Sequence, residues 1–432
     1  MRRKLGVILL VLLMLGASKS VFALETQSIK IDELGEGYKL IDNNLMISDS
    51  EFQEKFGYEI KRVADVLEFK SDNASIKFDT KENVFEINGK KLRSNIQSKD
   101  IEGQIYLPYR PLMYAIGYEI QWDGESRSVV SNSDVKSEKF EYNIKVLSGP
   151  TAVSFGKAVL NENYLGFNAD YKVEVLNQPK LASASILSKE ADVITVPSNM
   201  AAILYNKGAE YEVAGTMIWG NLYLASSEEI SSIENLRGKD IYLTGKNATP
   251  DILLQKILKD NGLDPQVDVN LVYLPGPQDL ASYAISGKAT IAVLPEPIMT
   301  KASMKNKDIK EVYDFQKYWK EAYNTEFGYP QTVVFVKKEF KNQHPNAYQT
   351  MLYALANDID WMNTDLEAAA VMGEQLEIGL TAPILKKALP RSNFHFKSAQ
   401  NSRKALETYL KALYEFNPKT IGEKIPDSSF WK

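Results

Sequence analysis

Three short segments after residue 140 carry residues that could hold a small molecule. Each follows an apolar segment and precedes a helical pattern; they are Gly149-Pro150-Thr151, Pro197-Ser198-Asn199 and Asn247-Ala248-Thr249. The first N–H groups of a helix have no partner within the helix and carry partial positive charge. If these segments converge, they would suit a carboxylate, sulfonate, phosphate or polarised carbonyl group. The alternative is that their hydroxyl side chains only cap the helices, with Thr249 as the N-cap residue of its helix.

Four single residues complete the predicted ligand site. Trp219, followed by Gly220, is expected to stack on the ligand because glycine permits close approach, with a buried core position as the alternative. Glu296 would accept hydrogen bonds from a ligand amine or amide, or form part of a hinge, and Tyr329 is a comparable contact. Arg391 is a candidate bidentate clamp for an anion. Because arginine is scarce in this region, a neutral or zwitterionic heterocycle fits at least as well as a strong anion.

Catalytic and metal-binding chemistry has few candidates in this chain. The sequence contains no cysteine, which excludes thiolate nucleophiles, cysteine metal sites and disulfides. Its two histidines lie in a polar turn, His344 before Pro345, and in an alternating apolar segment, His395 between Phe394 and Phe396. Both positions favour structural roles. The sequence therefore predicts a protein without catalytic residues, metal or cofactor.

The first 23 residues have the pattern of an export signal. A basic start is followed by an apolar run of 13 residues and by the small-residue site Val21-Phe22-Ala23. A bilayer-spanning helix needs about 20 apolar residues, so a membrane anchor is the weaker interpretation. Removal of this segment would take the formal charge from -5 to -9, because it carries four basic and no acidic residues. A nucleic-acid partner is disfavoured, and we expect an exported protein of the cell surface, cell wall or periplasm.

The elements that must position the predicted site form an α/β pattern from residue 142 onward. Apolar segments alternate with helical segments, which is typical of parallel sheets with helices on both faces. We therefore expect two doubly wound lobes. The predicted strands are Ile144 to Leu147, Val173 to Leu176, Val193 to Val196, Ile241 to Thr244, Val269 to Leu274, Ile291 to Leu294 and Val333 to Val336. Ligands of such sheets bind beyond the carboxyl ends of the strands, where the three segments described above lie.

The region before the α/β pattern has a different character. Residues 24–130 combine short strands, turns and one or two short helices, and Asn88-Gly89 is a two-residue hairpin signal. We expect a small α+β domain here. Residues 131–141 lack apolar periodicity and are typical of a linker.

Two family resemblances refine this organisation. The run from Ile105 to Leu112, followed by Ile116 to Ile120 and Gln121 to Gly124, resembles the copper amine oxidase N-terminal-like domain of secreted bacterial proteins. The name implies no oxidase activity for this domain, which contains no histidine. The resemblance implies a packing, tethering or wall-associated accessory domain, with the cell wall as a possible partner.

The remainder of the chain resembles the ABC-transporter substrate-binding proteins of the nitrate, sulfonate and taurine group, which are similar to thiamine-precursor binders. The segments that carry the resemblance include Ser148 to Ala152, Ala191 to Ala201, Ile233 to Lys239, Gly245 to Pro250 and Leu294 to Pro297. The resemblance implies a type 2 periplasmic-binding-protein fold, with lobe I at about 142–238 and 333–432 and lobe II at about 239–332. It also implies a ligand between the lobes, hinge closure and a membrane permease as partner.

The expected function is the delivery of a small organic solute to an ABC permease, without chemistry on the solute. The solute would be a sulfonate-, taurine- or nitrate-like anion or a vitamin-precursor heterocycle. Two alternatives remain open at this point. One is an enzyme on the same fold, similar to pyrimidine or menaquinone-pathway synthases, and the other is a cell-wall-associated sensor or interaction protein.

Overall fold

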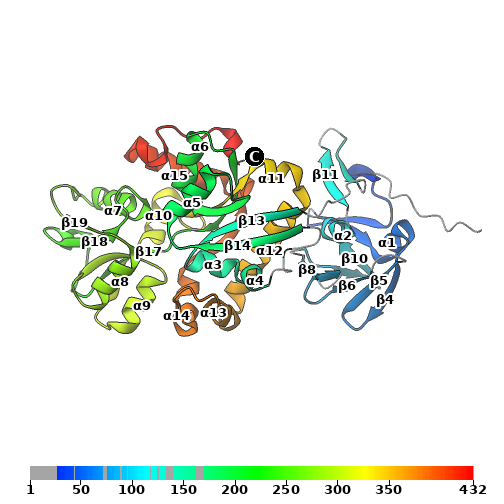
Figure 1. The fold of residues 1–432 in the computed structure, drawn as a ribbon, viewed down its shortest axis with the longest axis horizontal. Helices are drawn as coiled ribbons and strands as arrows, with labels where there is room; N and C mark the ends of the chain where they lie inside the picture. Colours follow the sequence, from blue (N-terminus) through cyan, green and yellow to red (C-terminus); the bar gives the residue numbers. More distant parts are fainter. Residues whose placement is uncertain are drawn as a thin grey trace, which may run out of the picture.

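The computed structural model places three folded regions in a row (Figure 1). It describes residues 27–42, 44–71, 75–87, 90–94, 96–116, 118–123, 126–132, 140–161, 165 and 169–431. The N-terminal region lies at one end, a six-stranded sheet with its helices lies in the middle, and a five-stranded sheet with its helices lies at the other end. The predicted export signal, the Asn88-Gly89 turn and most of the predicted linker lie outside the described residues.

The N-terminal region is an α+β domain of three antiparallel sheets, ordered β1-β12-β11, β2-β3-β10-β9 and β4-β5-β6-β7-β8. Side chains alternate between buried and exposed along strands such as β6, which places apolar residues on one face. The rings of Phe52, Phe69, Phe78 and Phe85 are fully buried between the sheets and the helices. The elements are β1 (Gln27–Lys30), β2 (Tyr38–Ile41), β3 (Asn44–Ser48), α1 (Asp49–Phe56), β4 (Glu59–Val63), β5 (Val66–Lys70), β6 (Ser75–Asp79), β7 (Val84–Ile87), β8 (Lys90–Arg93), β9 (Lys99–Ile101), β10 (Gln104–Pro108), α2 (Tyr109–Ala115), β11 (Glu119–Asp123) and β12 (Ser128–Asn132).

The six-stranded sheet, called here the first sheet, has the order β14-β13-β15-β22-β16-β23. Only β14, β13 and β15 are parallel to one another, and β22, β16 and β23 join by antiparallel pairing. The prediction of a parallel sheet is therefore correct for half of it. The strands are β13 (Phe140–Leu147), β14 (Ala169–Leu176), β15 (Val193–Pro197), β16 (Tyr211–Ile218), β22 (Thr332–Lys337) and β23 (Phe394–Ser398).

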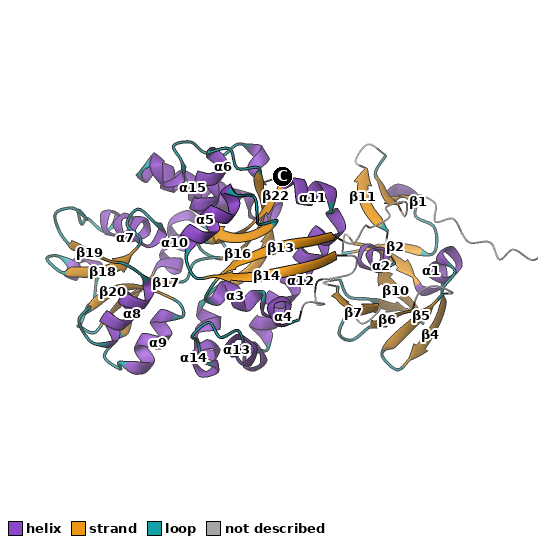
Figure 2. Ribbon diagram, in the orientation of Figure 1, coloured by secondary structure: helices purple, strands orange, loops and turns teal. Residues whose placement is uncertain are grey.

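The five-stranded second sheet repeats this design with the order β19-β18-β20-β17-β21. Strands β19, β18 and β20 are parallel, whereas β17 pairs antiparallel with β20 and β21. The strands are β17 (Leu222–Ser226), β18 (Asp240–Thr244), β19 (Asn270–Leu274), β20 (Ile291–Pro295) and β21 (Lys310–Asp314). Figure 2 shows helices on both faces of the two sheets, as the apolar strands require.

The helices that accompany the two sheets range in length from 5 residues in α3 to 20 residues in α12. They are α3 (Pro150–Ser154), α4 (Gly156–Leu160), α5 (Pro179–Leu187), α6 (Ser198–Asn206), α7 (Thr249–Asp260), α8 (Pro277–Ile285), α9 (Ile298–Lys305), α10 (Phe315–Tyr323), α11 (Lys338–Gln343), α12 (Pro345–Thr364), α13 (Leu366–Gln375), α14 (Ala382–Ala388) and α15 (Ala399–Phe416). Gly208 and Gly262 follow the ends of α6 and α7 with positive φ angles, a conformation that glycine adopts readily beyond a helix end.

The chain crosses between the sheets earlier than predicted. The boundary near residue 238 is wrong, because β17 is fully buried and pairs within the second sheet. The outward crossing therefore lies at 219–221, and the return lies at 328–331, close to the predicted position. The expectation failed because β17 follows β16 without an intervening helix.

One apolar core runs through both sheets on the side of α7 and α15, which we call the joined side. We call the first sheet with its helices the first region, and the second sheet with its helices the second region. The core includes Ile194 and Val196 of the first region and Leu243 and Ile257 of the second region, with Tyr409 of α15 between them. On the opposite side, which carries α3 and α14 in one region and α8 and α9 in the other, the apolar residues form two separate clusters. We call this the split side. The two regions thus share an apolar core on the joined side only, and on the split side α14 of one region contacts α9 of the other.

The N-terminal domain packs against α12 of the first region. Tyr353 of α12 extends the core of that domain, and a cavity of about 370 Å³ lies around it, lined mainly by the domain's apolar residues. Helix α12 also contacts β8 and β11. These contacts involve only the region of the first sheet.

Both histidines pack against aromatic rings of the α/β region. The His344 ring stacks on Phe140 with ring centroids 3.6 Å apart, and His395 packs near Phe327 at 4.3 Å. Burial lowers the pKa of His344, and burial, with Lys397 and Lys320 nearby, lowers the pKa of His395. The folded protein therefore binds fewer protons at these rings than the unfolded chain does.

We predict that these histidines make the protein less stable in mild acid. Their contribution is fully present above the ordinary pKa of about 6.5 and is lost as the pH falls through their lowered values. The melting temperature of the wild-type chain should decrease between pH 7.5 and 5.5 by more than that of the double variant His344→Gln/His395→Gln. An equal decrease in both proteins would contradict this account.

Candidate functional site

The three predicted ligand segments lie at the carboxyl ends of parallel strands, as expected. Gly149 ends the loop after β13, Pro197 ends β15, and Asn247 and Ala248 follow β18. Each segment leads directly into a helix, α3, α6 or α7. In open α/β sheets, ligands generally bind at this edge.

The capping roles predicted within these segments are wrong. Residues Gly149, Pro197 and Ala248 hold the N-cap positions, none of them with a side-chain cap hydrogen bond. Thr249 is the first helical residue, because Ala248 still has an extended backbone (φ -100°, ψ 174°). The helix therefore begins at Thr249 itself, one residue earlier than a cap at Thr249 would allow.

The hydroxyl and amide side chains of two segments contact the protein itself. The Ser198 hydroxyl donates to the carbonyl oxygen of Pro330, and the Thr249 hydroxyl lies 3.0 Å from that of Tyr409. The Asn199 amide donates to the carbonyl oxygen of Thr420 at 3.4 Å. These side chains connect α6 and α7 to the return crossing and to the C-terminal segment.

Two helix N-termini of the second region are occupied by carboxylates of the chain. A carboxylate oxygen of Asp251 accepts from the N–H of Asn247 at 2.7 Å, before α7. A carboxylate oxygen of Glu296 accepts from the N–H of Thr300 in the first turn of α9, at 3.2 Å. Both side chains are almost completely buried. The positions where a helix N-terminus would attract an external anion are thus partly satisfied by these two residues.

Trp219 lies in the outward crossing and is only 3% exposed. Its indole N–H donates to the carbonyl oxygen of His395 at 2.7 Å, and its ring packs near Phe327. The neighbouring Gly220 has a φ of 91°, and a Cβ there would lie 2.6 Å from Cε1 of Tyr329. The geometry favours the packing alternative for Trp219, and Gly220 is required for the approach of the Tyr329 ring.

Tyr329 is completely buried in the return crossing. Its ring meets Trp319 edge-on and stacks on Tyr409, in each case with ring centroids 5.9 Å apart. Its hydroxyl donates to Oε1 of Gln316 at 3.3 Å, and the same oxygen accepts from the N–H of Leu222 at 2.9 Å. Tyr329 therefore joins both crossings to α10 and α15, instead of facing a ligand as predicted.

Amide side chains link the two crossings directly. The Asn221 N–H donates to Oε1 of Gln331 at 3.1 Å, and the Gln331 amide donates back to Oδ1 of Asn221 at 2.9 Å. The Asn221 amide also donates to the carbonyl oxygen of Glu296 at 3.3 Å. Asn393 donates to the carbonyl oxygen of Trp219 in the outward crossing and to that of Phe327, which directly precedes the return crossing. Sequence reasoning missed these residues, and only their position beside the crossings could have indicated them.

Arg391 lies on the split side and contacts three residues of the second region. Its Nε donates to Oε1 of Glu296, and its Nη2 donates to Oε2 of Glu311 at 2.8 Å. The guanidinium lies over the Tyr223 ring, 4.2 Å from its centroid, and the Tyr223 hydroxyl donates to the Arg391 carbonyl oxygen at 2.9 Å. Arg391 is therefore not a free anion clamp, because two carboxylates of the chain already occupy it.

The carboxylate of Glu296 is completely buried in this contact. Burial raises its pKa above the ordinary value, and the hydrogen bonds from Arg391 and Thr300 oppose that rise. Glu296 also precedes a cis peptide bond to Pro297, which turns the chain from β20 into α9. A role of Glu296 in a hinge or a ligand contact stays a prediction; in the structure its carboxylate pairs with Arg391 where the two regions meet.

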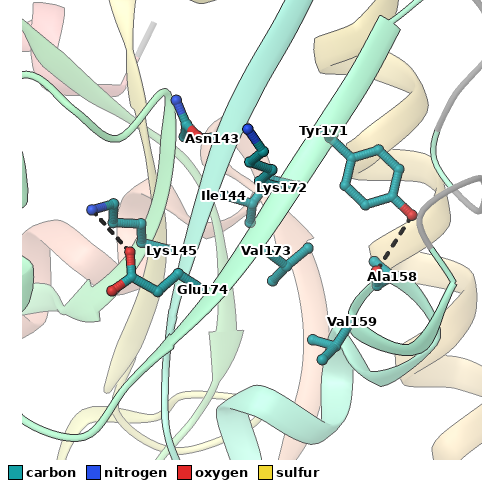
Figure 3. A pocket seen from close by; sticks show the side chains of 9 residues that line it. All are labelled: Asn143, Ile144, Lys145, Ala158, Val159, Tyr171, Lys172, Val173 and Glu174. Carbon is teal, nitrogen blue, oxygen red and sulfur yellow. Dashed lines mark hydrogen bonds and ion pairs between the residues drawn. The ribbon is translucent and has the colours of Figure 1, made fainter.

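Two further cavities lie away from this contact. One of about 660 Å³ is bordered by Lys246, Asn247, Tyr273 and Phe416 and reaches the buried Asp251 on the joined side. Figure 3 shows the other, of about 410 Å³, beside β13, β14 and α4. There Lys145 pairs with Glu174 at 3.0 Å, and the Tyr171 hydroxyl lies 3.4 Å from the Ala158 carbonyl oxygen. Of the residues predicted to hold the ligand, these cavities include only Asn247.

Within the described part of the chain, no group of three or more histidine or acidic residues could hold a metal ion. In the same residues, no helix has the length and apolar character needed to cross a membrane.

Comparisons with known proteins agree with this geometry. Residues 28–132 match the family described as copper amine oxidase N-terminal domain, and residues 195–376 match the NMT1-like family. A comparison with curated proteins finds no match to the sequence. The two resemblances predicted from the sequence are thereby confirmed.

Solved structures share the fold of the region after the N-terminal domain. An ABC transporter protein from Parabacteroides distasonis is 25% identical, with a TM-score of 0.58 over 67% of this chain and 98% of that one. The periplasmic aliphatic sulphonate binding protein of Escherichia coli is 15% identical, with a TM-score of 0.54 over 66% and 89%. The alkanesulfonate-binding protein of Xanthomonas axonopodis pv. citri is 13% identical, with a TM-score of 0.52 over 67% and 96%. The region has the type 2 periplasmic-binding-protein fold.

We predict that Gly220 is essential for the packing of the crossings. Gly220→Ala should lose stability both from its positive φ angle and from the clash with Tyr329, at about 1–3 kcal/mol for the clash alone. Gly208→Ala is the matched control, because Gly208 has a φ of 92° and open space around it. It should cost only about 1–2 kcal/mol. Equal losses in urea unfolding would show that the Tyr329 contact is unimportant.

We also predict that Arg391 holds the regions together on the split side. Arg391→Gln leaves the Glu296 carboxylate buried without its partner and should reduce the unfolding free energy by about 3 kcal/mol. Arg403→Gln, which removes an exposed pair with Glu407, should change it by less than about 0.5 kcal/mol. The double variant Arg391→Gln/Glu296→Gln should recover part of the loss. Similar unfolding curves for the two single variants would contradict this role.

Proposed function

We propose that the protein is an extracytoplasmic solute-binding protein of an ABC importer, which closes on a small organic solute without chemical change. The observation that carries the proposal is the asymmetry of the joint between the two regions. Their apolar core is continuous on the joined side and divided on the split side, where Arg391 pairs with Glu296 and Glu311 across the two regions. Such a joint favours hinge motion that opens the split side.

The proposed ligand site lies on the split side between the two regions. The loop with Gly149, Pro150 and Thr151 borders it from the first region, since the residues that follow belong to the apolar cluster of that side. Glu296 borders it from the second region, and Arg391 bridges the two. Sulfonate-like or nitrate-like anions and vitamin-precursor heterocycles are the solute classes to be tested.

The cellular setting is part of the same proposal. The export pattern in residues 1–23 supports a location outside the cytoplasm, and an ABC permease would be the membrane partner. The N-terminal domain would act as an accessory domain for the cell surface or cell wall. Because it contacts α12 and not the second region's strands, it leaves the proposed closing motion free.

We predict saturable binding of a solute without turnover. A ligand at 100 times its dissociation constant should stabilise the full chain by about 2.7 kcal/mol, which appears as a rise in melting temperature. The measurement is a thermal-shift panel of sulfonates, nitrate, carboxylates, vitamins and pyrimidines, followed by analysis of the recovered compound. Recovery of a chemically altered compound, or the absence of any shift across the panel, would contradict the proposed function.

A further inference from the structure

The charges around Arg391 bear on the kind of solute that the protein accepts. Arg391 carries one formal positive charge, and its two partners, Glu296 and Glu311, carry two formal negative charges. The cluster therefore has a net charge of -1. An anion that entered beside it would meet a net repulsion, of which water screens a part because Arg391 and Glu311 are 35% and 34% exposed.

The other arginines of this region are also paired. Arg237 forms an ion pair with Asp268, and Arg403 pairs with Glu407 at 2.8 Å on α15. In the loops that follow β13, β15, β18 and β20, the sequence contains a single cation, Lys246. Lys246 is exposed and lies near Tyr273 on the joined side, 5.4 Å from the ring centroid. The split side thus receives no other cation from these loops.

Backbone N–H groups at the helix starts are partly used within the chain. Glu296 accepts from an N–H in the first turn of α9, Asp251 accepts from an N–H just before α7, and the N–H of Ser198 donates to the carbonyl oxygen of Gln331 at 3.0 Å. Pro150 has no N–H at the start of α3. A buried anion with few cationic partners would lose its hydration with incomplete compensation.

We infer that the solute of this protein carries no net negative charge, and that Glu311 determines this specificity by occupying Arg391 together with Glu296. The solute class is an uncharged or cationic molecule whose N–H groups can face the carboxylates. This inference rests on the proposed solute-binding function. It separates the chain from structural neighbours that are named as sulfonate-binding proteins.

The first test compares solute classes on the full wild-type chain by calorimetry. The anionic probes are nitrate and ethanesulfonate, and the other probes are uncharged and cationic aminopyrimidines. We expect saturable binding within the second group and at least a hundredfold weaker binding of both anions. Tighter binding of either anion would overturn the inference while supporting the proposed function. Absence of binding by every probe, together with no shift in the wider panel, would count against the proposed function itself.

The second test uses Glu311→Gln, which removes one carboxylate from Arg391 and leaves Glu296 in place. This variant should bind ethanesulfonate at least tenfold more tightly than the wild type does. Glu229→Gln is the matched control, because it removes the same charge from an exposed loop after β17. It should leave ethanesulfonate binding unchanged. Equal binding by both variants would overturn the role of Glu311, and a circular-dichroism melt of each variant confirms that it is folded.

Discussion

The contact between the Tyr329 ring and Gly220 is the constraint on which the two-region architecture depends. Each crossing of the chain passes through this contact, and no larger residue fits at position 220 without displacing the ring. The ring also packs on Trp319 and Tyr409, which connects the crossings to the continuous core of the joined side. The apolar surface buried on one side opposes separation of the regions, and the proposed hinge motion would bend this joint.

The split side follows from the same arrangement. Since the apolar clusters are separate there, the two regions meet through charged and polar groups, and Arg391 is the centre of that contact. When such a contact opens, its polar groups can form hydrogen bonds with water or with a ligand, whereas an exposed apolar core cannot. In the proposed function, a solute would take the place of this polar contact while the apolar connection stays. The accessory domain on α12 lies beside this mechanism and contributes no residue to the crossings.

Sequence patterns located every parallel strand and the antiparallel β22, but missed the other antiparallel strands. Strands such as β15, β18 and β22 are short apolar runs, and their positions were correct to within a residue. Strands β16, β17, β21 and β23 were absent from the predicted set. The reason is clearest for β16 and β17, which are consecutive in the chain but belong to different sheets, so no helix separates them. Local periodicity cannot reveal such a change of sheet.

The site residues illustrate the same limit. Glu296 and Arg391 were each recognised from the sequence, but they are 95 residues apart, and their pairing arises only from the fold. Trp219 and Tyr329 were recognised as unusual aromatic residues beside glycine, which is a signal that close ring packing and ligand stacking share. The fold resolves this ambiguity in favour of packing. The loops at the strand ends were placed correctly, because their position follows from the direction of parallel strands.

The most direct measurement of the central claim is native mass spectrometry of the full chain purified from its own cells. The account predicts a single noncovalent small molecule bound in a one-to-one ratio, released unchanged on unfolding and able to rebind. A covalent adduct, or the appearance of a product formed from the released molecule, would contradict a receptor that closes on its solute without chemistry.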